Sequence, residues 1–300
     1  MIFLPQRHQD TKNLLALENP KVKADSSCTM KHKNLIILAT AFLAALVPFL
    51  FWRATWFGRS LSDQEIDKYL AGDKPLHVQH ALSQVSERIV AGRIRPDDAA
   101  RWYPRIAALS RHASPEIRST DAWVMGQDNT SEEFHRALLG LLRDPEPLVR
   151  RNAALSLVRF GDPGARAELL LMLRPYPIRS PQSGKVTLRL AEQEAANPGT
   201  LLARLEVGAG EKIEIRSPLP GLVDKKLVVD GQSVEAGAPI MVLAPAPEQV
   251  WEALRALVLV GRSEDLPEVE RLVRGRAGEG SNDKISQQAE LTIRAIRARP

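Results

Sequence analysis

Few side chains in this sequence are spaced in a way that could support catalysis or metal binding. His77 and His80 stand three residues apart in a segment of helical period, a spacing that can hold a metal, but no further ligand is suggested nearby. Ser233, in GQSVEAG, lacks the second glycine of a nucleophile elbow and lies in a predicted β turn. We therefore interpret the histidines as polar residues of a helix face and Ser233 as a turn residue. We predict no catalytic residue, no metal site and no enzymatic activity.

Other conspicuous side chains are expected to have structural roles. Three tryptophans fall on the apolar faces of predicted helices and are expected in the core: Trp102, Trp123 and Trp251. Three arginines at repeated helix positions are expected to pair with acidic residues of neighbouring repeats: Arg118, Arg150 and Arg151. Glu206 and Glu211 flank a tight hairpin and are expected to be solvated.

The charge distribution argues against a nucleic-acid-binding protein. The chain of 300 residues has a formal charge of +5, but residues 1–59 contain eight Lys and Arg against three Asp and Glu, which accounts for the whole excess. Residues 60–300 contain 33 of each sign. A protein that follows a phosphate backbone needs clustered, uncompensated cations on its folded surface. The only cysteine, Cys28, leaves no disulfide framework and no Cys-based metal site.

Residues 34–52, NLIILATAFLAALVPFLFW, form an uncharged apolar segment bounded by Lys33 and Arg53. As a helix, these 19 residues reach about 28 Å, close to the hydrocarbon thickness of a bilayer. Aromatic residues gather at the C-terminal end, as is typical of a headgroup boundary. The sequence therefore predicts one transmembrane helix over 34–52, preceded by a disordered tail over 1–33.

A cleavable signal peptide is the alternative interpretation of this segment. Such a peptide needs small residues just after its apolar core, and here that place is taken by FLFWRATWF. We therefore expect an uncleaved anchor. Lys31 and Lys33 favour a cytoplasmic N-terminus. The expected location is the inner membrane of a bacterium, with a single pass through the bilayer and the C-terminal part in the periplasm.

From residue 61 to 173 the sequence predicts pairs of amphipathic helices joined by polar, proline-marked turns. The predicted pairs are 62–70 with 75–92, 96–112 with 114–128, and 130–144 with 145–162. In PEIRSTDAWVM and PLVRRNAALSL, Arg118 and Ala122 match Arg150 and Ala154, a period of 32 residues. A helix–turn–helix unit with such a period indicates an α-solenoid.

The phrases DPEPLVRRNAALSL, SPEIRSTDAWVMG and ALRALVLVGRSEDLPEVERLV resemble HEAT repeats of the short bacterial, phycobilin-lyase-like type. The resemblance implies HEAT-like helical repeats over 61–173 and again over 247–298. The segment 164–173 predicts the first helix of a further pair, whose partner is expected only at 247–261. Residues 177–244 are therefore predicted to be inserted in a loop of one repeat, where insertions are tolerated.

The inserted segment contains one short phrase twice, SPQSG at 180–184 and SPLPG at 217–221. Each copy opens a half-domain of short strands interrupted by Gly and Pro, and neither half can bury a core alone. The two halves together are predicted to form one all-β domain. Its fold-defining turn residues are Ser180, Pro181, Gly184 and Gly199 in the first half, and Ser217, Pro218, Gly221, Gly231 and Gly237 in the second.

The pattern S-P-x-x-G-x-V, followed by D-G-x-x-V-x-x-G, resembles the barrel-sandwich hybrid of biotinyl and lipoyl domains and of periplasmic membrane-fusion adaptors. The carriers in these families hold a modified lysine at the tip of the hairpin that joins the halves. Here the tip is GAG at 208–210, and Lys212 stands at the start of the following strand. Efflux adaptors insert a long helical hairpin at this joint, whereas only seven residues separate Leu205 from Ile213.

These patterns predict a multidomain protein with one N-terminal transmembrane helix, an α-solenoid of HEAT-like helix pairs and an inserted all-β barrel-sandwich hybrid domain. We expect a membrane-anchored, non-enzymatic scaffold or adaptor without a cofactor, which contacts protein partners in a transport or secretion assembly. The alternative is a biotinyl- or lipoyl-type carrier modified at Lys212. A lyase-like activity would rest on the HEAT resemblance alone, and no acid–base constellation supports it.

Overall fold

The computed structural model describes Thr40, residues 42–44, 46–47, 59–208, 210–274 and 283–299. The chain divides into two units, residues 1–59 and residues 60–300. The predicted tail, 1–33, and most of the predicted transmembrane segment, 34–52, lie outside the described residues. No helix within the described part of the chain is long and apolar enough to cross a membrane.

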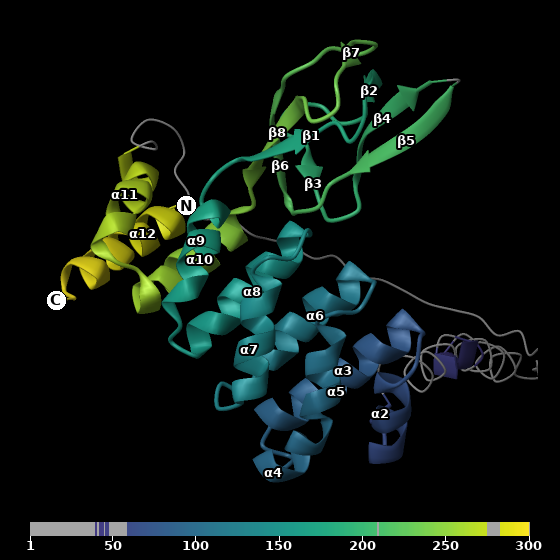
Figure 1. Ribbon diagram of the computed structural model, residues 1–300, viewed down its shortest axis with the longest axis vertical. Coiled ribbons are helices and arrows are strands. Elements are labelled where there is room, and N and C mark those ends of the chain that lie inside the picture. The colour runs from purple at the N-terminus through teal and green to yellow at the C-terminus, as the bar shows by residue number, and fades with distance from the viewer. Residues whose placement is uncertain are drawn as a thin grey trace, which may run out of the picture. The chain divides into compact units, whose positions relative to one another are not determined.

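The helical region of the second unit is built from stacked pairs (Figure 1). The first helices of the pairs are α2 (Asp63–Leu70), α5 (Tyr103–Leu109), α7 (Glu132–Leu141), α9 (Arg166–Met172) and α11 (Leu266–Arg274). The second helices are α3 (Pro75–Val90), α6 (Pro115–Met125), α8 (Pro147–Arg159), α10 (Pro247–Val260) and α12 (Asp283–Arg297). Each first helix packs against the second helix of its pair, and successive second helices pack against each other. The predicted array of helix pairs is confirmed.

Proline and serine set where these helices begin. The helices α3, α6, α8 and α10 each have proline in the first turn, where the missing N–H costs no hydrogen bond. The side chains of Ser62, Ser114 and Ser131 accept a backbone N–H at the N-termini of α2, α6 and α7. These caps explain why the polar turns of the sequence mark the helix boundaries so closely.

The single helix predicted over 96–112 is wrong. This stretch contains α4 (Pro96–Ala99), the 3₁₀ turn η2 (Ala100–Trp102) and α5, which starts at Tyr103 with Pro104 in its first turn. Because Pro104 has no N–H to donate to an earlier carbonyl, the helix restarts there. Two further 3₁₀ turns, η3 (Pro163–Ala165) and η4 (Ser263–Asp265), lead into α9 and α11.

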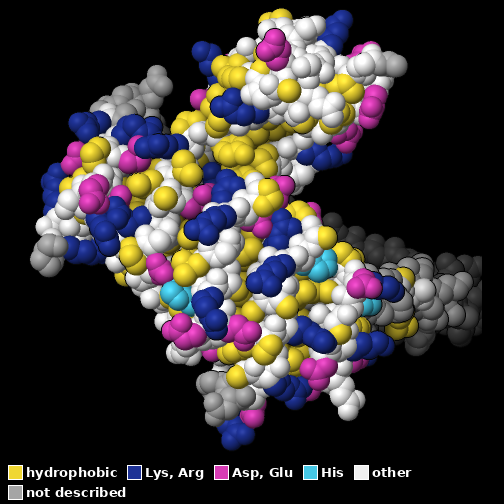
Figure 2. All heavy atoms as spheres, viewed as in Figure 1, with side chains coloured by type: hydrophobic (Ala, Val, Ile, Leu, Met, Phe, Trp, Pro, Cys, Tyr) yellow, Lys and Arg dark blue, Asp and Glu magenta, His cyan; other side chains and the backbone are white. Residues whose placement is uncertain are grey.

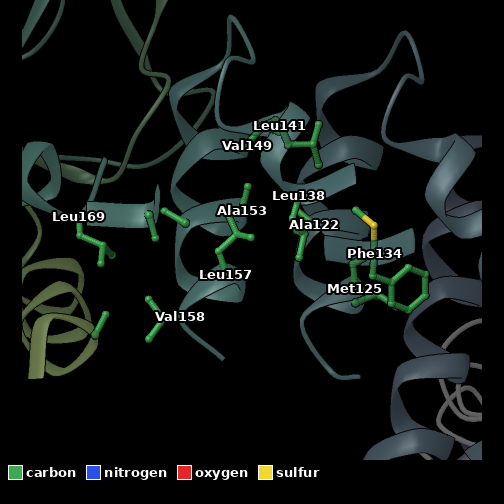
Figure 3. Packing of buried hydrophobic residues seen from close by; sticks show 14 of the residues in the cluster. Ala122, Met125, Phe134, Leu138, Leu141, Val149, Ala153, Leu157, Val158 and Leu169 are labelled. Carbon is green, nitrogen blue, oxygen red and sulfur yellow. The ribbon is translucent and has the colours of Figure 1, made fainter. Parts of the chain in front are cut away.

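The helical core lies between the layer of first helices and the layer of second helices. Figure 3 shows Phe134 and Leu138 of α7 lying close to Ala122 and Met125 of α6, and all four are fully buried. A hydroxyl-to-carbonyl hydrogen bond links neighbouring second helices twice. Ser156 Oγ donates to the carbonyl oxygen of Ala122 at 2.8 Å, and Thr292 Oγ1 donates to that of Leu254 at 2.9 Å. These bonds fix the register between successive pairs.

The β region contains eight strands in two antiparallel sheets, and it confirms the prediction of a separate β region. The strands are β1 (Tyr176–Arg179), β2 (Gly184–Leu188), β3 (Ala195–Ala196), β4 (Leu201–Val207), β5 (Glu211–Arg216), β6 (Gly221–Lys226), β7 (Ser233–Val234) and β8 (Pro239–Pro245). One sheet has the order β1-β8-β6-β3 and the other β5-β4-β2-β7. Each sheet therefore takes strands from both halves of the duplicated sequence.

An approximate twofold relates the two sheets. Exchanging β1 with β5, β2 with β6, β3 with β7 and β4 with β8 converts one strand order into the other. The register follows the same relation, because Val186 lies opposite Leu205 in one sheet and Val223 lies opposite Leu243 in the other. All four residues are buried in the core of the β region. The two halves thus form one core by exchanging strands between the sheets.

The β strands lie within one helix pair in the sequence. The chain enters β1 after α9 and leaves β8 for α10, and α9 packs against α10 although all eight strands lie between them along the chain. The helix α10 also packs against α8 and α12. The stack of helix pairs therefore continues across the inserted strands.

Candidate functional site

The duplicated turns of the β region are closed crosswise. Gly237, late in the second half, donates its backbone N–H to the carbonyl oxygen of Ser180 at 2.7 Å, and Gly199, late in the first half, donates to that of Ser217 at 2.8 Å. Both glycines have positive φ, 79° and 85°, a conformation that side chains disfavour. Pro181 and Pro218 follow the two serines and lie outside the strands. The repeated phrase therefore ties each half to the other.

Gly184 and Gly221 occupy positions where a strand approaches the backbone of its neighbour. A Cβ on Gly184 would lie 2.5 Å from the carbonyl oxygen of Glu206, and a Cβ on Gly221 would collide with that of Ala244. Gly231 has a φ of 79°, in the turn before β7. The preceding Asp230 accepts the backbone N–H of Leu188 at 2.6 Å. These positions shape the backbone and present no reactive group.

The hairpin between β4 and β5 carries Lys212. Lys212 lies opposite Glu206 in the antiparallel register, and both side chains are exposed. Gly208 and Gly210, with φ of 50° and 96°, form the turn, and Glu211 begins the next strand with its side chain exposed. Ala209, at the tip, lies outside the described residues. The lysine is accessible to a modifying enzyme, but it lies on a strand and not at the tip.

His77 packs on an aromatic ring and Ser233 lies on a strand, as structural residues do. The ring of His77 stacks on Tyr69 with 4.4 Å between centroids. Ser233 lies in β7 opposite Lys185, with an exposed side chain. Over the described residues, no group of three or more His, Cys, Asp or Glu side chains could hold a metal ion.

Two of the repeated arginines tie neighbouring helix pairs together, as expected. Arg118 pairs with Asp144 at 2.6 Å, and Arg150 pairs with Glu168 at 3.1 Å. Burial raises the pKa of Asp144, but the hydrogen bond from Arg118 and the nearby arginine charges outweigh it, so its pKa lies below the ordinary value. In Figure 2, Lys and Arg side chains are scattered among acidic and apolar ones on the face shown.

Arg151 behaves differently from its neighbour. Its side chain is buried and donates to the amide oxygen of Gln249 on α10, while its Nε has no hydrogen-bond partner. Burial lowers the pKa of Arg151 to about 10. The expectation that Arg151 pairs with an acidic residue is wrong. Arg151 bonds instead to the side-chain amide of Gln249, which follows the inserted strands in the sequence.

The expectation that all three tryptophans lie in the core is wrong for two of them. Trp102 is buried and donates its indole N–H to Asp67 at 2.7 Å. Trp123 on α6 and Trp251 on α10 remain 49% and 37% exposed. The guanidinium of Arg255 lies over the Trp251 ring, 4.6 Å from its centroid. Trp251, Arg255 and Leu259 are spaced four residues apart, which places them on one face of α10. This spacing is the signal in the sequence that could have indicated an exposed face with a tryptophan on it.

Comparison with known proteins supports the helical part of the fold. A family model described as HEAT repeats matches residues 104–179, from α5 to the end of β1. No curated protein matches the chain. A solved structure described as a single-chain, multi-domain long-chain acyl-CoA carboxylase is 24% identical over 35% of this chain and 10% of that chain, with a TM-score of 0.23. The match thus spans about a tenth of that protein's length. An engineered protein is 13% identical over 79% of this chain and 80% of its own, with a TM-score of 0.40.

Proposed function

We propose that this protein is a membrane-anchored, non-enzymatic scaffold that binds protein partners. The observation that carries this proposal is the stack of helix pairs, which continues past the inserted strands and matches HEAT repeats over residues 104–179. Stacked helical repeats present extended surfaces that suit protein recognition. The uncharged segment at 34–52 supports the membrane anchor. Lys31 and Lys33 on its N-terminal side support a periplasmic C-terminal part.

The β region is proposed to be a barrel-sandwich hybrid of the biotinyl and lipoyl type, used as a second contact surface. The interleaved sheets and the crosswise closure of the SP-x-x-G turns support this assignment. A place in a transport or secretion assembly rests on the resemblance to membrane-fusion adaptors alone.

Crosslinking in native membranes tests the scaffold function. The full chain is crosslinked, purified and analysed for protein partners, and proteinase is added to intact spheroplasts in a parallel sample. We expect reproducible partners and digestion of residues 60–300 in the intact spheroplasts. An absence of partners contradicts the scaffold, and digestion only after lysis contradicts the periplasmic placement.

The second candidate function is a carrier domain modified at Lys212. The exposure of Lys212 beside a glycine-rich hairpin favours it. Intact mass measurement of the natively produced protein separates the two functions, because biotin and lipoyl groups add defined masses. An adduct that is lost in Lys212→Arg would establish a carrier, whereas the unmodified mass would remove this candidate.

A further inference from the structure

The second helices carry side chains that reach the surface at one equivalent position in four successive pairs. Trp123, Arg255 and Leu291 are exposed there, and Leu155 is half-buried. The cross-helix hydrogen bonds define the equivalence: Trp123 and Arg255 directly follow the acceptors Ala122 and Leu254, while Leu155 and Leu291 directly precede the donors Ser156 and Thr292. Because α6, α8, α10 and α12 pack side by side in this order, these positions form a row across the four helices.

On α10 the row widens by one turn in each direction. Trp251 lies one turn before Arg255 and Leu259 one turn after it, and Leu259 is 66% exposed. On α12, Leu291 is 50% exposed. We call this surface the second-helix strip: Trp123, Leu155, Trp251, Arg255, Leu259 and Leu291. Exposed tryptophan and arginine are characteristic of protein-binding surfaces, since these two residue types are enriched among those that dominate the energetics of interfaces. The exposed leucines beside them add apolar area.

Two arginines lie on or beside the strip, Arg255 on α10 and Arg159 on α8. Arg255 stacks on Trp251, and Arg159, in the last turn of α8, donates to the amide oxygen of Gln127 at 2.9 Å. Neither arginine forms an ion pair with any residue that the structure describes. Exposed glutamates also lie near the strip, Glu248 and Glu252 in the N-terminal half of α10 and Glu290 next to Leu291. The C-terminal halves of α8 and α10 carry the two arginines and no exposed carboxylate. A partner that covers these halves gains from acidic side chains.

We propose that the second-helix strip binds an acidic amphipathic helix of another protein, lying across α6, α8, α10 and α12. Neighbouring packed helices are about 8–10 Å apart, and two turns of a helix rise about 11 Å. A crossing helix therefore places apolar residues about seven positions apart over Trp123, Leu155 and Leu291, and an acidic residue over Arg255. This inference rests on the proposed function as a protein-binding scaffold.

Photocrosslinking of the full chain in the cells that naturally make it tests the proposal. A benzophenone amino acid replaces Trp123 or Leu291 in the strip. It replaces the exposed Leu139 on α7 and Val229 in the β region as controls. We expect adducts from both strip positions on one partner segment, identified by mass spectrometry. That segment should carry Asp or Glu among heptad-spaced apolar residues, with its two crosslinked sites about 20 residues apart.

A charge variant makes the expected result specific. Arg255→Glu is expected to lower the strip adducts about tenfold, whereas Arg255→Lys and the remote Arg143→Glu retain them. Adducts on a second copy of this chain, or on a basic or wholly apolar segment, overturn the proposal. Adducts only at the Leu139 or Val229 positions overturn it while leaving the scaffold function intact. The absence of adducts at all four positions overturns both.

Discussion

Ser180 and Ser217 make the same hydrogen bond in the two halves of the β region. Each buried hydroxyl donates to the carbonyl oxygen two residues further on, that of Gln182 at 2.7 Å and that of Leu219 at 2.6 Å. The bond turns the chain sharply before Gly184 and Gly221, where the strands run too close to their neighbours for a Cβ. The repeated phrase therefore sets the same backbone turn in both halves, and no catalytic or binding role is needed to explain the repetition.

Ser180→Ala and Ser217→Ala are expected to destabilise the β region by about 1 kcal/mol each, because each removes a buried hydrogen bond and leaves a carbonyl oxygen unpaired. Hydrogen exchange of the β-region amides measures the effect locally. The exposed Ser233 provides the control, and Ser233→Ala is expected to leave exchange unchanged. Unequal costs at the two related serines would argue against the twofold relation.

Gly184→Ala is expected to destabilise the β region by about 2 kcal/mol or more, since the new Cβ meets the carbonyl oxygen of Glu206 and the strands must separate. Gly140→Ala serves as a control of opposite sign. Gly140 lies in α7 with nothing within 4 Å of a Cβ, so alanine there raises helix propensity and stabilises by up to about 1 kcal/mol. Thermal unfolding of the full chain reports both changes, and a neutral Gly184→Ala would contradict the close strand approach.

Gln193 has the conformation of a glycine. Its φ is 68°, and Gly231, at the related position of the other half, has a φ of 79°. The two residues donate equivalent bonds, from Gln193 N–H to the carbonyl oxygen of Val223 and from Gly231 N–H to that of Val186, both at 2.7 Å. Because a side chain costs about 1 kcal/mol in this region of φ, Gln193→Gly should stabilise and Gly231→Ala should destabilise by about that amount. Opposite shifts in the unfolding midpoint are expected, and equal shifts would contradict the comparison.

The division into a helical array and a separate β region could be predicted because each region carries its own period. A 32-residue helical repeat and a duplicated β phrase are both visible without any contact being known. Strand exchange between the sheets could not be predicted, since Gly and Pro mark turns and leave the pairing partner of each strand open. The break at 100–102 follows from Pro104, a signal present in the sequence but overlooked among strong helix formers.

The sequence did not reveal the exposure of Trp123 in the second-helix strip, because α6 reverses the usual burial of its residue types. Asp121 is buried in this helix and Trp123 is half exposed. In PEIRSTDAWVM the apolar residues cover a wide arc of the helix, so helical spacing alone does not tell that Trp123 faces outward. The packing of α3 and α8 against α6 decides which of its side chains are buried.

Asp121 also gives the clearest dependence on pH. Neither of its carboxylate oxygens has a hydrogen-bond partner, and burial raises its pKa well above the ordinary value. A carboxyl group with a raised pKa in the folded state stabilises the fold fully only below its unfolded pKa of about 4, and this contribution is lost as pH rises toward the folded pKa. Asp121→Asn removes the ionisation and should stabilise the protein at pH 7 by at least about 1 kcal/mol, with little effect near pH 4.

Asp144→Asn provides the matched control of opposite sign for this experiment. The pKa of Asp144 lies below its ordinary value, so its contribution is present above pH 4 and is lost as pH falls. Asp144→Asn should therefore destabilise at pH 7 and approach the wild type in acid. Unfolding midpoints of the three proteins between about pH 2 and 8 give both differences directly, because the Asp144 contribution is lost only below about pH 4. Because the native protein and each variant share every other titrating group, a difference for Asp121→Asn that stays constant over this range would show that Asp121 does not titrate above pH 4.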